Sequence, residues 1–249
     1  MLSLVVLLAF GAGFLDAVLG MGYGTILAPL LLLFGYRVPE LVPALLLSQF
    51  AAGLVGARFH HLNGNASFTR GSVHLKVAAV LMGAGLAGGL GGPWLARQVS
   101  EPVVRVYMGL MILSLGCWLM VGWRGYRFSW MRLVALGVVA SVNKALTGGG
   151  YGPLLAGGQM VAGLNPKAAV AITNLAEAVV SLTALIGYAW WFAASWRWEL
   201  VLAVTGGAAL AAPLGARAVR LVGMETLRTV VGAATVCLGL LALLSVRGA

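Results

Sequence analysis

The chain has 249 residues, of which 61% are hydrophobic and only 9% are charged, and its mean hydropathy is +0.99. Soluble globular domains are about 45–50% apolar and about 25% charged, so this chain has too few charges to cover a water-soluble surface. The composition excludes a soluble enzyme, a nucleic-acid-binding domain and a disordered chain. It predicts an all-helical, multi-pass membrane protein.

The net charge of +10 comes from basic residues that are scattered singly between apolar segments. In such places Lys and Arg side chains contact lipid phosphates at the membrane surface. No run of basic residues is long enough for a nucleic-acid-binding patch. We therefore expect the lipid bilayer as the surrounding of this chain and no nucleic acid as a partner.

Apolar segments long enough to cross a membrane recur along the whole chain, because a spanning helix needs about 20 mostly apolar residues. Two further stretches, 24–34 and 151–162, are too short to cross alone, and each follows a cluster of glycines. Broken helices persist in a bilayer only where protein or a water-filled cavity surrounds them. The eight predicted long segments are 2–19, 41–60, 73–96, 103–122, 131–147, 168–192, 199–219 and 226–246.

Three sequence matches, in the same order in both halves, indicate an internal duplication. We predict an N-terminal repeat at 1–123, a link at 124–130 and a C-terminal repeat at 131–249. If the glycine-broken unit crosses once, each half has four crossings and the repeats are parallel; if it is a re-entrant hairpin, each half has three and the repeats are inverted. The matching stretches are 20–28 with 148–156, 93–97 with 213–217, and 105–116 with 228–239.

Three charged residues, Asp16, Lys144 and Glu177, fall well inside apolar segments. A charge in mid-membrane costs a few kcal/mol and by default marks a pathway or a paired site. Asp16 lies four residues before Gly20, and Lys144 lies four residues before Gly148, so the repeat places them at equivalent positions. One interpretation is a buried Asp16–Lys144 ion pair that holds the halves in register. The other is an anion site at Lys144, next to the positive end of the half-helix that follows the second break.

The glycine clusters and two polar pairs complete the predicted substrate site. Glycines let a backbone approach a ligand closely, and tyrosine hydroxyls are donors. The predicted residues of the clusters are Gly20, Gly22, Tyr23 and Gly24, with Gly148, Gly149, Gly150, Tyr151 and Gly152. The polar pairs are Ser48 with Gln49 and Thr173 with Asn174, which either line the site or bridge helices.

Glu177 lies one helical turn after Thr173 and on the same face. A buried carboxyl group in this position is suited to carry a proton, and we therefore interpret Glu177 and Asp16 as candidates for proton coupling or ion pairing. The sequence predicts no metal site and no cofactor, because its two cysteines lie in apolar segments and its vicinal histidines do not share a helical face.

An ion channel and an intramembrane enzyme are the alternatives to a carrier. The sequence Gly-Tyr-Gly occurs at 22–24 and 150–152 and is similar to part of a potassium-channel filter, but that filter needs four copies, and Lys144 beside the second copy repels cations. An intramembrane enzyme is not predicted, since neither His-Glu-x-x-His nor Gly-x-Ser-x-Gly occurs. Paired glycine-broken segments are typical of secondary transporters.

The glycine break at 20–24, its second copy at 148–152 and the stretch Asn-Pro-Lys-Ala-Ala-Val-Ala-Ile-Thr-Asn at 165–174 resemble the TauE/SafE family of sulfite and organosulfonate exporters, also called the four-toluene-sulfonate-uptake or DUF81 family. The resemblance covers essentially the whole chain. It implies a transporter in a prokaryotic cytoplasmic membrane that exports small anions, such as sulfite, sulfoacetate, other organosulfonates or organic acids, by alternating access.

Overall fold

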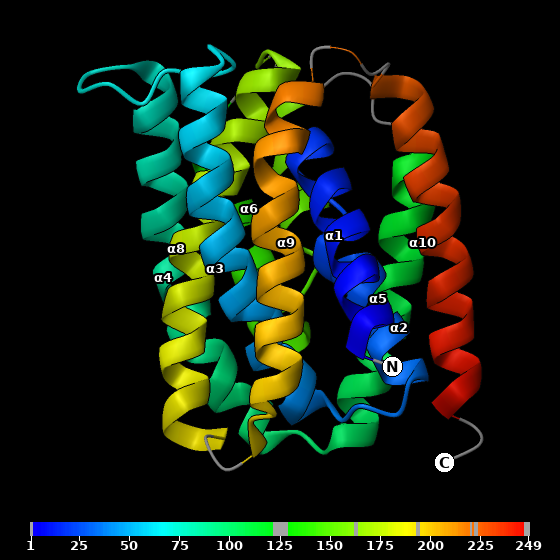
Figure 1. Cartoon of the computed structure of the whole chain (residues 1–249). Helices are drawn as coiled ribbons and strands as arrows, with labels where there is room; N and C mark the ends of the chain where they lie inside the picture. Colours follow the sequence, from blue (N-terminus) through cyan, green and yellow to red (C-terminus); the bar gives the residue numbers. More distant parts are fainter. Residues whose placement is uncertain are drawn as a thin grey trace.

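The computed structural model describes residues 2–121, 129–161, 164–192, 195–219, 221 and 224–246, and the described residues form α-helices joined by short connections (Figure 1). Residues 124–128 of the predicted link at 124–130 lie outside these residues, and Trp130 is the first residue of α6. The helices are α1 (Leu2–Leu19), α2 (Tyr23–Leu33), α3 (Val38–Leu62), α4 (Val73–Gln98), α5 (Glu101–Val121), α6 (Trp130–Thr147), α7 (Tyr151–Val161), α8 (Pro166–Phe192), α9 (Trp198–Ala218) and α10 (Met224–Val246).

Five described helices are long and apolar enough to cross a membrane: α1, α3, α4, α8 and α9. This confirms the predicted class of all-helical membrane protein. The two short apolar stretches form α2 and α7, which have 11 residues each. At about 1.5 Å per residue, each covers roughly half of a hydrocarbon core about 30 Å thick.

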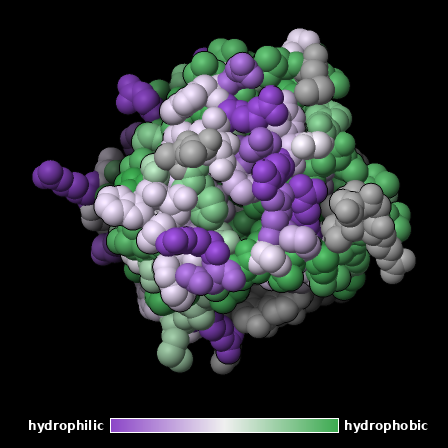
Figure 2. All heavy atoms as spheres, turned by 90° about the horizontal axis from the view of Figure 1, so that it is seen from below, coloured by the Kyte–Doolittle hydropathy of each residue, from purple (hydrophilic) through white to green (hydrophobic). Residues whose placement is uncertain are grey.

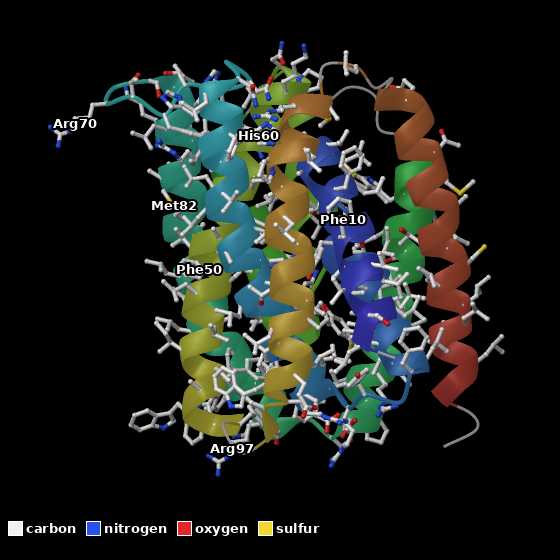
Figure 3. All side chains as sticks on the ribbon, viewed as in Figure 1. Phe10, Phe50, His60, Arg70, Met82 and Arg97 are labelled. Atoms are coloured by element: carbon white, nitrogen blue, oxygen red, sulfur yellow. The ribbon has the colours of Figure 1, made fainter. Side chains whose placement is uncertain are left out.

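The central helices α3 and α8 pack against each other and run in opposite directions. Figure 3 places His60, near the end of α3, at the upper end of the bundle, and Arg97, near the end of α4, at the lower end. Ala168, in the first turn of α8, packs with Ala66, which follows α3. Val38 at the start of α3 and Tyr188 near the end of α8 line one cavity at the other end.

Helix contacts between the two halves of the chain occur in matched pairs. Helix α1 packs on α9, and α6 packs on α4; α3 packs on α9, and α8 packs on α4. If α1–α5 are matched in order with α6–α10, each of these contacts corresponds to another in the same set. The remaining large contacts, α3 with α8 and α5 with α10, join matched helices to each other.

Small residues allow these helices to approach closely. A methyl group added at Gly13 of α1 would lie 2.9 Å from the Ala208 Cα atom of α9, and one at Gly88 of α4 would lie 2.7 Å from the Val142 nitrogen of α6. In lipid, helix association depends on such van der Waals packing. The hydrophobic effect does not drive it, because lipid tails are as apolar as the helix surface. The helices α1, α4, α6 and α9 are therefore held close to the central helices α3 and α8.

A buried histidine joins three helix ends at the upper end of the bundle. His60 Nε2 lies 3.0 Å from the Ala17 carbonyl oxygen of α1, and His60 Nδ1 lies 3.0 Å from Asn65 Nδ2. Asn65 Nδ2 also donates to the Ala216 carbonyl oxygen of α9, at 3.0 Å. Because Ala17 offers only an acceptor, Nε2 is the donor, and Nδ1 of the neutral ring accepts from Asn65.

Candidate functional site

The two glycine breaks have the same backbone conformation. Helices α1 and α6 each end at a left-handed glycine, with φ of 67° at Gly20 and 75° at Gly148. In both, the glycine N–H donates to the carbonyl four residues earlier, which is that of Asp16 at 2.6 Å or that of Lys144 at 2.7 Å. A second positive φ follows two residues later at Gly22 and Gly150. Residues with a Cβ atom are strained in this region, so glycine is required to end one helix and start the next.

The two breaks contact each other directly. Gly24 packs against the backbone of Gly148, and Gly152 packs against that of Gly20. A methyl group at Gly149 would lie 2.7 Å from the Gly24 carbonyl carbon. In this conformation the glycines therefore serve for close backbone packing and leave no space for a ligand between the two breaks.

Lys144 lies beside this contact and is completely buried. Its Nζ atom donates to Glu177 Oε1 at 2.7 Å and also to Gln49 Oε1. Gln49 Nε2 donates to the same Glu177 Oε1 at 2.9 Å. Lys144 from α6, Gln49 from α3 and Glu177 from α8 thus form one buried triad, in which every member contacts the other two.

The ion-pair partner of Lys144 differs from the one predicted. The structure pairs Lys144 with Glu177, whereas the position of Asp16 in the repeat suggested an Asp16–Lys144 pair. The Asp16 carboxylate instead accepts the Tyr23 N–H at 3.4 Å, at the positive end of α2. The carboxylate can cap the helix that follows it, and a lysine at the equivalent position cannot. Lys144 therefore extends toward the acceptors on α3 and α8.

A small cavity of about 10 Å³ adjoins the triad. This volume suits about one water molecule. Asn174 lines it, and its Oδ1 atom is buried with no hydrogen-bond partner among the described residues. The polar residues of the cavity wall are Asp16, Tyr23, Gln49, Asn174 and Glu177.

The other predicted polar residues bridge helices or bond locally. The Ser48 hydroxyl donates to the Leu45 carbonyl at 2.8 Å, within its own helix. Thr173 Oγ1 accepts from Gln159 Nε2 at 2.9 Å, which joins α8 to α7. The Tyr23 hydroxyl donates to the Val204 carbonyl at 3.3 Å, and the Tyr151 hydroxyl is buried with no partner among the described residues. Of the two polar pairs, only Gln49 and Asn174 line the cavity.

One relationship within the site was missed in the sequence. The offset of 128 residues that relates Gly20 to Gly148 also relates Asp16 to Lys144 and Gln49 to Glu177. The sequence interpretation instead matched Ser48-Gln49 with Thr173-Asn174. Extending the offset of the glycine motifs through the next segment would have identified Gln49 as the counterpart of Glu177.

The comparisons with known proteins agree with this architecture. The family model described as Sulfite exporter TauE/SafE matches residues 5–242. The chain is 25% identical over 216 residues to the probable membrane transporter protein YtnM of Bacillus subtilis (strain 168), covering 81% of this chain and 69% of that protein. No solved structure shows a significant match. A match over nearly the whole length is sufficient to assign the chain to the TauE/SafE sulfite exporter family of membrane transporters.

Proposed function

We propose that this protein is a secondary carrier that exports small anions, such as sulfite, sulfoacetate and other organosulfonates or organic acids, across a prokaryotic cytoplasmic membrane. The observation that carries the proposal is the buried triad of Lys144, Gln49 and Glu177 at the junction of the two glycine breaks. A fully buried lysine in a membrane helix is expensive and is kept for a pathway or a site. Its charge is the counter-charge for the transported anion.

The anion replaces Glu177 as the partner of Lys144. In the present conformation Lys144 forms its ion pair with Glu177. The adjoining cavity of about 10 Å³ has space for little more than a water molecule. An anion that binds Lys144 displaces the Glu177 carboxylate. Protonation of the displaced carboxylate would keep the net charge of the buried site unchanged when the anion binds, and an unbalanced charge in mid-membrane is costly. This exchange links anion binding to proton binding, with Glu177 as the proton carrier and Asp16 as the second acidic group of the cavity.

The two halves act as inverted repeats in this proposal, with the repeats at 1–123 and 131–249. The opposite directions of α3 and α8 and the matched helix contacts between the halves support the inverted alternative. Inverted repeats place a substrate site at their interface, near the membrane midplane, between broken helices. The triad joins α3, α6 and α8 and lies at such an interface. Rocking of the halves about it exposes the site to each side in turn.

A potassium-selective channel is the less favoured alternative. The last glycine of each Gly-Tyr-Gly sequence packs against the backbone just before the other one, Gly24 against Gly148 and Gly152 against Gly20. Tyr23 and Tyr151 are buried, at 1% and 0% exposure. A filter instead needs carbonyl oxygens directed at an open ion path. The positive charge of Lys144 beside the second sequence disfavours cations.

Transport by the purified protein in liposomes tests the proposal. Vesicles that contain the protein and are loaded with sulfite should release it with a saturable rate that depends on a pH gradient. Vesicles with Lys144→Met protein should release sulfite no faster than sulfite-loaded liposomes without protein. Potassium currents, or release that rises linearly with concentration, would contradict the carrier mechanism.

A further inference from the structure

The lower end of the bundle has a second cavity that the proposed transport site does not include. It has a volume of about 170 Å³, against about 10 Å³ beside the triad. It lies between the start of α3, the end of α4, the start of α5 and the end of α8. Val38 and Tyr188 are each 11 residues from the triad residue on their own helix, which corresponds to about 16 Å along the helix. Figure 2 shows hydrophilic side chains across this lower face, with hydrophobic side chains around much of its rim.

A buried hydrogen-bond donor in this cavity has no partner. Tyr188 lines the cavity and is 1% exposed, and no described residue bonds its hydroxyl group. A buried hydroxyl group without a hydrogen-bond partner is destabilising. An anion that enters the cavity would supply the missing acceptor.

Arg97 also lines this cavity, and it is exposed at the lower end of the bundle (Figure 3). Its guanidinium group stacks over the Trp191 ring, 4.4 Å from the ring centroid, and it forms no ion pair with a carboxylate among the described residues. Arginine that stacks on an aromatic face keeps its donors free for a bidentate bond to an anion.

The nearby carboxylate does not oppose anion binding, because arginines already neutralise it. Glu101 Oε1 accepts from Arg105 at 2.8 Å, and Glu101 Oε2 accepts from Arg37 at 3.2 Å. The Val38 N–H donates to Glu101 as well, at 3.4 Å. Both carboxylate oxygens are therefore occupied.

The rest of the cavity wall is apolar, including Val99, Val104 and Phe192. An ionic head at Arg97 and Tyr188 would thus be joined to an apolar body against these side chains. Inorganic ions lack such a body and would leave the apolar part of the cavity unfilled.

We propose that this cavity is a second anion site, separate from the Lys144 triad, which binds an anionic head group through Arg97 and the Tyr188 hydroxyl and a short apolar chain through Val99, Val104 and Phe192. The ligand is an amphiphilic anion with a sulfonate, carboxylate or phosphate head. The site exists whether or not Lys144 binds substrate, so it does not rest on the carrier mechanism.

Equilibrium binding of butanesulfonate to the full chain in a neutral detergent tests the proposal. Calorimetric titration of the Lys144→Met variant, which lacks the central counter-charge, isolates the second site. In this background Arg97→Gln and Tyr188→Phe should each weaken the remaining binding by about tenfold or more, as for loss of a hydrogen bond to a charged group. Arg70→Gln, at the opposite end of the bundle (Figure 3), is the matched control and should leave binding unchanged.

Each outcome is distinct from a failure of the proposed function. If Lys144→Met protein that is folded at the titration temperature binds no butanesulfonate, or if the remaining binding is indifferent to Arg97→Gln and Tyr188→Phe in variants whose melting temperature equals that of Lys144→Met, the second site is excluded. If Lys144→Met alters nothing and Arg97→Gln removes all binding, the second site stands and the Lys144 site fails. Titration of the protein in lipid nanodiscs identifies the source of the anion. If butanesulfonate binds more weakly in phosphatidylglycerol than in phosphatidylcholine, the lipid head group competes for the site and is its ligand. If butanesulfonate binds with equal affinity in both lipids, the ligand is a soluble anion.

Discussion

Gln49 and Glu177 are 128 residues apart, the same offset as Gly20 and Gly148, and bond directly to each other, Nε2 to Oε1, at 2.9 Å. Both contact the Nζ atom of Lys144. One of the two positions has an amide and the other a carboxylate, and it is the carboxylate that forms the ion pair with the buried Lys144. The two positions differ in charge but share the same contacts.

Exchange of these two side chains tests their equivalence. Glu177→Gln alone leaves Lys144 as an uncompensated buried charge, so we expect a loss of about 3–5 kcal/mol in unfolding free energy. The double variant Gln49→Glu/Glu177→Gln restores one carboxylate within reach of Lys144 and should recover most of that stability. Thermal unfolding in detergent measures both effects. A double variant no more stable than Glu177→Gln would show that the two positions are not equivalent.

Sequence reasoning identified the helices well, because membrane insertion is dominated by apolar length. The predicted segment 2–19 coincides with α1, and 41–60 lies within α3. The glycine breaks were identified for a local reason, since repeated positive φ values at Gly20 and Gly148 require that residue. Both features depend on short stretches of chain and hardly on the tertiary arrangement.

The partner of Lys144 was not identified, because it depends on which faces of α3 and α8 meet α6. Hydropathy reports the depth of a residue in the bilayer and not the direction of its side chain. Asp16 and Lys144 were matched by the predicted repeat, but equivalence under a repeat does not require contact. The order of the helices around the centre, with α9 beside α1 and α4 beside α6, has no local signal in the sequence.

Close packing of the two breaks predicts a strong effect of a single methyl group. Gly152→Ala would place its Cβ against the Gly20 carbonyl, where backbone cannot yield. We expect a loss of at least about 1–3 kcal/mol in unfolding free energy from overpacking. Gly83→Ala is the matched control: it lies in a helix with no atom within 4 Å of the added Cβ, and it should stabilise by up to about 1 kcal/mol. Equal melting temperatures for the two variants would be inconsistent with the contact.

We expect His60, at the upper end of the bundle, to stabilise the fold and to have no direct effect on substrate binding. His60→Ala removes the hydrogen bond to the Ala17 carbonyl and the acceptor for Asn65, so we expect a loss of about 1–3 kcal/mol in unfolding free energy. His61, which is exposed, is the control, and His61→Ala should cost less. Binding of sulfite by the folded His60→Ala protein should be unchanged, and a selective loss of affinity at intact stability would instead place His60 in the transport pathway.

Lys144 allows the substrate site to be separated from a purely structural ion pair. Lys144→Met should abolish sulfite binding at the central site, because loss of a charge-assisted contact to a desolvated anion costs about 2–5 kcal/mol, roughly 30-fold or more in affinity. The same change removes the ion-pair partner of Glu177 and should lower the melting temperature, since it strands a buried carboxylate. Lys144→Met/Glu177→Gln relieves that charge and should restore stability, but it should not restore binding. Sulfite binding is measured by calorimetry and unfolding by thermal melts of the same preparations. If the double variant regained both stability and wild-type affinity, Lys144 would serve only to neutralise Glu177, and the anion site would lie elsewhere.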